Sequence, residues 1–127
     1  MNKQQIIKIL KQYNFDNKEY IVISGAAMVL LGIKENTNDI DIAVTSNYYN
    51  YLLSKYECIL EIINQYGVKV YFIDNIINFS TSYYSENKIF IDNIPVQSIQ
   101  NIVNLKSKLN REKDKKDMKL IEEFINE

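Results

Sequence analysis

The chain of 127 residues contains no histidine and only one cysteine, Cys58. Without histidine it cannot build the Ser-His or Cys-His pairs of nucleophilic enzymes, nor a histidine metal site. A single cysteine excludes an internal disulfide and a multi-cysteine zinc site. Carboxylates are therefore the side chains left to carry any metal chemistry.

A long apolar run and a strong net charge are also missing. No stretch approaches the roughly 20 apolar residues that span a bilayer, and the first residues alternate too finely for a signal peptide. We therefore expect a cytoplasmic protein without a membrane partner. The formal net charge of -1 provides no global basic field, so nucleic acid could bind only at a local patch.

The remaining composition is that of an ordinary globular protein. Hydrophobic residues make up 46% and charged residues 24% of the chain, which argues against disorder. The length favours one domain, 1–127, and no internal repeat or long linker interrupts it.

The hydrophobic periodicity predicts helices interleaved with strands. Helices are expected in the first dozen or so residues, in 26–32, after Ser46, after Ser98 and after Asp114, with these three polar residues as N-caps. Strands are expected in 19–24, 38–44, 57–63, 68–73 and 88–96, where the last range holds two short strands. Residues 74–88 are predicted to form a loop or irregular lid. The expected fold class is α/β (α+β), a mixed β-sheet flanked by helices.

Two aspartates interrupt an otherwise apolar strand in the stretch SGAAMVLLGIKENTNDIDIAV. Asp39 and Asp41 are two residues apart, so both side chains point to the same face, with Cα atoms about 6.5 to 7 Å apart. Two carboxylates so placed can converge on one or two hard cations such as Mg²⁺. The alternative is a sheet with one solvated face, on which the aspartates only add solubility.

The same stretch begins with Ser24-Gly25, between a strand and a helix. A small residue pair at such a turn lets backbone N–H groups approach phosphates closely, at a helix end that favours anions. Simple turn geometry is the alternative. A phosphate-type turn followed by two carboxylates suggests phosphoryl or nucleotidyl transfer.

These motifs resemble the signature of the nucleotidyltransferase superfamily that includes DNA polymerase β and the minimal nucleotidyltransferases. In that signature a Gly-Gly or Gly-Ser turn precedes Asp-x-Asp by roughly a dozen residues. The later stretch IPVQSIQNIVNLKSKLNREKDKKDMKLI is similar to the Leu-Lys helix and Lys-Asp-x-x-Asp ending of small bacterial members. The resemblance runs from about Tyr20 onward.

The resemblance implies a nucleotidyltransferase-like fold and a nucleoside triphosphate, such as ATP, bound with Mg²⁺ or Mn²⁺. A nucleoside monophosphate would pass to a hydroxyl on a protein, an RNA or a small molecule. Asp39 and Asp41 would hold the metal, while Ser24, Gly25, Thr37 and Lys106 would bind the nucleotide. Lys106 has an alternative as a snorkelling lysine at the edge of the core.

Family members usually carry a third carboxylate on a later strand. Matching the stretch GVKVYFI places Tyr71 at that position, and tyrosine is a poor metal ligand at neutral pH. Asp74 is the nearest acid and a candidate catalytic residue, although its alternative is a turn residue in Asp74-Asn75. The sequence thus leaves two functions open, a transferase or a catalytically impaired binding or regulatory module, for instance in a toxin–antitoxin pair. A second copy or a partner protein could complete the acceptor site.

Overall fold

The computed structural model describes residues 1–127 and contains five helices and one mixed sheet of seven strands. The helices are α1 (Lys3–Tyr13), α2 (Ser24–Leu30), α3 (Ser46–Lys55), α4 (Ile99–Leu109) and α5 (Glu112–Ile125). The strands are β1 (Tyr20–Val22), β2 (Ile40–Val44), β3 (Cys58–Ile63), β4 (Lys69–Ile73), β5 (Ile77–Ser80), β6 (Lys88–Ile91) and β7 (Ile94–Gln97). The predicted fold class is confirmed.

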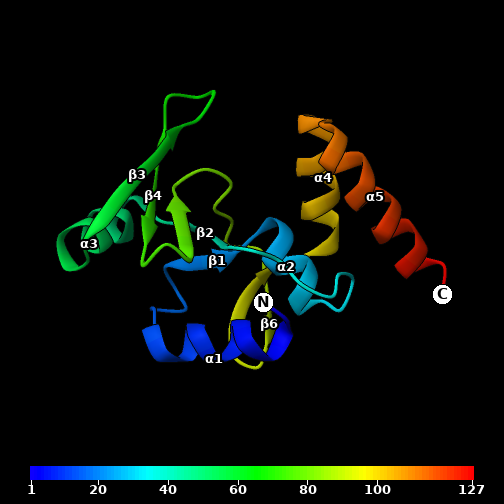
Figure 1. Ribbon diagram of the computed structural model, residues 1–127, viewed down its shortest axis with the longest axis horizontal. Helices are drawn as coiled ribbons and strands as arrows, with labels where there is room; N and C mark the ends of the chain where they lie inside the picture. The colour runs from blue at the N-terminus through cyan, green and yellow to red at the C-terminus, as the bar shows by residue number, and fades with distance from the viewer.

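The sheet has the order β3-β4-β5-β2-β1-β7-β6, so β2 and β1 lie near its centre. The β1–β7 and β2–β5 pairs are parallel and the other pairs are antiparallel. In Figure 1 the β3–β4 hairpin lies at one end of the molecule, while α4 and α5 pack side by side at the other. None of the helices is both long and apolar enough to cross a membrane.

The two faces of β2 have different surroundings, as its alternating sequence predicts. Ile40, Ile42 and Val44 belong to a core of 23 buried residues that also takes in side chains of all five helices. Ala43 belongs instead to a small cluster with Ile21 and Ile23. The second face of the sheet is therefore only partly covered, and it is the face that carries Asp41.

The prediction of a loop over residues 74–88 is wrong in its first part. Ile77–Ser80 forms β5, which pairs in parallel with β2 and antiparallel with β4. The sequence INFS is short and half polar, so local pattern alone gives a weak strand signal. Its strand conformation depends on β2, a partner more than 30 residues away in the sequence.

Two of the three predicted helix caps are wrong by a few residues. Ser98 caps α4 by accepting a hydrogen bond from the N–H of Asn101. The cap of α3 is Thr45 rather than Ser46, because the Thr45 hydroxyl accepts from Tyr48. Asp114 lies in the first turn of α5, where its carboxylate accepts the N–H of Arg111, the residue that precedes the helix.

Candidate active site

Residues from five parts of the chain meet in a cavity of about 440 Å³ beside the N-terminal end of β2. Six of the predicted site residues line this cavity together: Ser24, Gly25, Thr37, Asp39, Asp41 and Lys106. Asp39 immediately precedes β2 and Asp41 is its second residue. The structure therefore brings the turn and the aspartate pair to one place.

The turn before α2 combines an unusual backbone with a close contact. Ser24 has φ 58°, in the left-handed region that serine rarely adopts, and its N–H donates to Oε1 of the buried Gln97 at 3.0 Å. A Cβ on Gly25 would lie 3.2 Å from Oγ1 of Thr37. Ser24 is therefore the residue with the strained backbone. Glycine at position 25 leaves room for Thr37 to approach the turn.

Asp41 is the carboxylate whose titration is most affected by this environment. Its pKa is raised to about 6, chiefly by burial and also by the nearby charges of Asp39 and Glu61, while a hydrogen bond from Asn78 acts in the opposite direction. The Lys113 ammonium opposes this rise. The protein alone therefore does not fully compensate the negative charge of Asp41, which is a property expected of a cation-binding position.

Replacing Asp41 by asparagine should stabilise the fold at neutral pH in the absence of divalent cations. The folded state binds the Asp41 proton more tightly than the unfolded state, so the free energy of unfolding falls as pH rises from about 4 to 6. Asp41→Asn removes this cost and should raise the unfolding free energy at pH 7.5 by up to about 3 kcal/mol. Most of the gain should vanish at pH 4.

Urea denaturation at both pH values checks this expectation. Asp92→Asn is a matched control, because Asp92 is exposed and forms only a surface ion pair with Lys11. A loss of stability in Asp41→Asn at pH 7.5 would contradict the expected sign.

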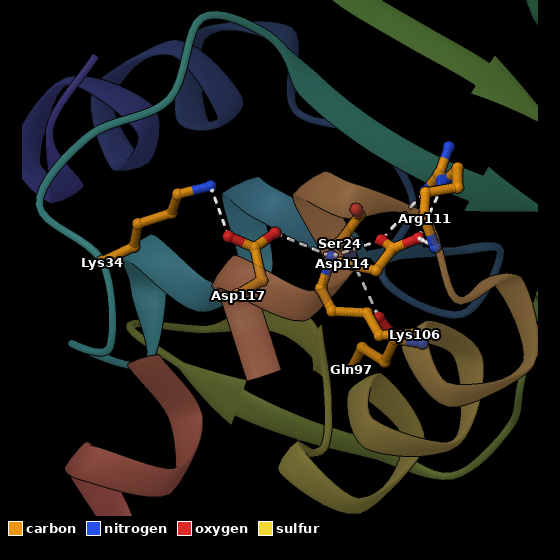
Figure 2. A network of polar contacts seen from close by, with 7 residues as sticks. All are labelled: Ser24, Lys34, Gln97, Lys106, Arg111, Asp114 and Asp117. Carbon is orange, nitrogen blue, oxygen red and sulfur yellow. Dashed lines mark hydrogen bonds and ion pairs between the residues drawn. The ribbon is translucent and has the colours of Figure 1, made fainter. Parts of the chain in front are cut away.

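Lys106 is buried and its ammonium contacts two carboxylates, Asp114 and Asp117 (Figure 2). Its side chain is only 3% exposed, and Nζ lies 2.9 Å from Oδ2 of Asp117 and 3.5 Å from Oδ1 of Asp114. The simple snorkelling alternative does not describe it, because the charged end is enclosed rather than solvated.

The network extends from Lys106 to two further cations (Figure 2). Lys34, in the loop between α2 and β2, places Nζ 3.1 Å from Oδ1 of Asp117. Arg111 donates from Nε at 2.6 Å and from Nη2 at 3.1 Å to Asp114. Burial alone would raise the pKa of Asp114, but hydrogen bonds from Arg111 and the Lys106 charge lower it to about 2. The network joins α4, α5 and the α2–β2 loop around the cavity.

Asp74 lies apart from these residues. It occupies the turn between β4 and β5 with φ 53°, and its carboxylate accepts a hydrogen bond from the hydroxyl of Tyr13 on α1. It lines neither the cavity of Asp41 nor the cavity beside it. The structure therefore shows the turn position that the sequence left as the alternative.

The structure does not place Tyr71 at the site either. Tyr71 pairs with Phe79 in the sheet, and its ring packs against Phe79 and Tyr49 on the core face. The strand beside β2 is β5, and the residue paired with Asp41 is Asn78. Tyr71 therefore lies on the opposite face of the sheet from Asp41, and Asn78 is the residue beside Asp41.

A second cavity of about 390 Å³ adjoins the first and shares Ser24, Asp41 and Lys113 with it. Its lining includes Glu61 of β3 and Asn78 of β5, both missed by the sequence prediction. Asn78 could have been found only by recognising β5. Glu61 lies in a strand that was predicted, but nothing local indicates which way its side chain points.

Lys113 and Lys116 are further cavity residues that the sequence prediction did not include. They are one turn apart on α5, and Leu120 continues the same face into the cavity lining. The spacing of these three residues along one face of α5 is the sequence signal that could have identified them. The alternating charges of the stretch KSKLNREKDKKDMK obscured it, because other lysines of the run lie on different faces of the helix.

The His, Cys, Asp and Glu side chains form no group of three or more that could hold a metal ion. Asp39 and Asp41 therefore have no third carboxylate with them at metal-binding distance. Any ion between them would need its remaining ligands from substrate oxygens and water.

Comparison with known proteins agrees with the architecture. No protein-family model matches the chain, and no curated protein matches it in sequence. A crystal structure of a Thermotoga maritima protein, TM1012, to which a nucleotidyltransferase function is attributed, is similar with a TM-score of 0.63. The match covers 99% of this chain and 96% of that one. The chain has a nucleotidyltransferase-like fold. At 15% sequence identity the likeness concerns the fold, so the activity has to be argued from the site.

Proposed function

We propose that the protein is a divalent-cation-dependent nucleotidyltransferase that moves a nucleoside monophosphate from a nucleoside triphosphate to a hydroxyl group. The observation that carries the proposal is the shared cavity, in which Asp39 and Asp41 face the Ser24-Gly25 turn together with several lysines. Solvation of a sheet face does not account for this arrangement, because the aspartates line a concave site opposite a tight turn.

The residues present fit a Mg²⁺ or Mn²⁺ ion. Asp39 and Asp41 offer hard oxygen donors, and the charge of Asp41 is costly to maintain without a cation. Mg²⁺ in phosphate-processing sites commonly takes one or two carboxylates and completes its octahedron with phosphate oxygens and waters. Bound there, the ion would neutralise phosphate charge and stabilise the leaving pyrophosphate.

The opposite wall of the cavity suits the triphosphate. The Ser24-Gly25 turn and Thr37 present small polar groups, and Lys113 and Lys116 add positive charge. Lys34 and Lys106 also line this wall, although both are paired with Asp117. We assign Lys106 a supporting role through its charge and through the placement of α5.

Replacing Lys116 by alanine should weaken the binding of Mg²⁺-ATP about tenfold. A charge-assisted hydrogen bond to phosphate contributes about 1.5 kcal/mol, which corresponds to this factor in Kd. Titration calorimetry measures the change, with Lys119→Ala as a matched control because Lys119 lies on α5 outside the cavity. Equal affinities of the two variants would remove Lys116 from the phosphate site.

The acceptor hydroxyl would reach Asp41 through the second cavity, on the side of β3 and β5. Together the two cavities form one groove divided at Asp41. A protein side chain, an RNA end and a small molecule all carry suitable hydroxyls. A second copy or a partner protein could add further walls to so small a chain.

A second candidate function is a nucleotide-binding or regulatory module with an impaired catalytic centre, for instance in a toxin–antitoxin pair. The observation that favours it is Asn78, an amide in the position paired with Asp41 where a third acid would strengthen metal binding. Such a module would bind nucleotide with Mg²⁺ without transferring it.

Two measurements on the wild-type chain separate the candidates. Calorimetry with ATP, with and without Mg²⁺, reports binding, and release of pyrophosphate from ATP in the presence of a hydroxyl acceptor reports transfer. Binding with pyrophosphate release supports the transferase, whereas binding alone supports the module. Absence of Mg²⁺-dependent ATP binding would refute both.

A further inference from the structure

We infer that Glu61, on the edge strand β3, is the carboxylate that receives the proton of the acceptor hydroxyl during transfer. The inference rests on the proposed function and assigns a role on the acceptor side of the groove. Glu61 lines the second cavity together with Asp41, and no other residue of β3 besides Ile62 does so.

An irregularity in the β3–β4 pairing places both Glu61 and Ile62 on the face of the sheet that carries Asp41. Leu60 pairs with Tyr71 and Ile62 pairs with Val70, so Glu61 is an extra residue without a partner in β4. In a regular strand, neighbouring residues point to opposite faces, yet Glu61 and Ile62 both line the same cavity. Such bulges re-aim side chains and occur frequently beside active sites.

Asn78 connects Glu61 to the centre of the proposed site. Its side-chain amide donates to Oε2 of Glu61 at 3.5 Å, and Asn78 pairs with Asp41 across β5 and β2. Asn78 thus lies between Asp41 and Glu61. An amide in this position can orient the carboxylates of Asp41 and Glu61. An acid at position 78 would add negative charge between them.

The other acids near the groove are engaged elsewhere. Both oxygens of Asp117 contact lysines, and Asp114 is held by Arg111 and Lys106. Glu61 forms no ion pair, and its side chain accepts a hydrogen bond from the neutral Asn78 amide.

The chemical step balances with Glu61 as the proton acceptor. The acceptor hydroxyl oxygen forms a bond to the α-phosphorus of the nucleotide, and the bond from that phosphorus to pyrophosphate breaks. The hydroxyl proton passes to the Glu61 carboxylate and then to solvent. A general base in this position typically contributes about 10² to 10⁴ in rate.

Glu61→Gln tests the assignment, because glutamine keeps the shape and the contact to Asn78 but cannot accept a proton. The assay uses ATP with Mg²⁺ and glycerol as the hydroxyl acceptor, and measures glyceryl-AMP and pyrophosphate. We expect kcat to fall at least about 100-fold, with little change in the KM for ATP and in the melting temperature. Glu57→Gln is the matched control, since Glu57 is exposed, immediately precedes β3 and lines neither cavity.

A second readout distinguishes this role from metal binding. The affinity for Mn²⁺, measured by electron paramagnetic resonance without nucleotide, should change less than about twofold in Glu61→Gln, whereas loss of a ligand or its support costs roughly 10- to 100-fold. A large loss of Mn²⁺ affinity would overturn the assignment.

The remaining outcomes separate the assignment from the proposed function. Equal kcat in Glu61→Gln and wild type would also overturn the assignment and leave the transferase intact. Absence of pyrophosphate release from the wild type would overturn the transferase and, with it, the role of Glu61.

Discussion

Replacing both Asp39 and Asp41 by asparagine is expected to lower the rate of Mg²⁺-dependent pyrophosphate release from ATP at least about a thousandfold. Losing a single preorganised electrostatic group typically costs about 10² to 10³ in rate, and this change removes both anionic anchors of the proposed metal site. The amides keep nearly the same volume, so the cavity itself should persist.

The same double variant should remain folded, which makes the loss of activity interpretable. The stabilisation expected for Asp41→Asn at pH 7.5 gives an internal check, because an inactive variant that is more stable than wild type has not lost activity by unfolding. Asp92→Asn, an exposed acid far from the cavity lining, should retain full activity. Undiminished transfer by the folded double variant would refute the proposed site.

Replacing Lys106 by methionine should lower the free energy of unfolding by about 3 kcal/mol or more. Removing one partner of a buried ion pair leaves uncompensated charge and typically costs about 3 to 5 kcal/mol. Here the ammonium lies between Asp114 and Asp117, both buried, and its loss would leave each carboxylate with one remaining cationic partner, Arg111 or Lys34. Methionine has similar length, so lost packing should contribute little.

Urea denaturation of Lys106→Met beside Lys108→Met provides the test. Lys108 lies on the same helix and is exposed, so its replacement should change stability by no more than about 0.5 kcal/mol. Adding Asp117→Asn to Lys106→Met should recover part of the loss, because it removes one of the two carboxylates that lost a cationic partner. Similar stabilities of the two lysine variants would show that the buried network is not a major source of stability.

The parts of the fold that sequence predicts well are those with a local cause. The alternation of Ile40, Ile42 and Val44 with the aspartates follows from the two-residue period of a strand, and it held in the structure. The Ser98 cap is equally local, because its acceptor and donor are three residues apart. The resemblance of residues 24–44 to nucleotidyltransferases predicted that the Ser24-Gly25 turn and the two aspartates belong to one site.

The parts that sequence did not predict depend on distant partners. β5 is a strand because β2 pairs with it, and its recognition decides that Asn78, rather than Tyr71, lies beside Asp41. The position of Glu61 and Ile62 in the lining of one cavity depends on a slip in register against β4, which no pattern within β3 reveals. The burial of Lys106 depends on two aspartates from the next helix, whereas a lysine beside an apolar stripe ordinarily extends into water.

The network around Lys106 also determines when the cavity exists during synthesis of the chain. The turn at Ser24 emerges early, but Lys113, Lys116 and Asp117 belong to the last helix. A nascent polypeptide that ends within α4 has the aspartate strand and an apolar sheet, yet Lys106 lacks both of its anionic partners. The wall of the cavity that α5 forms is therefore assembled last, and unfinished chains released from the ribosome lack the complete cavity.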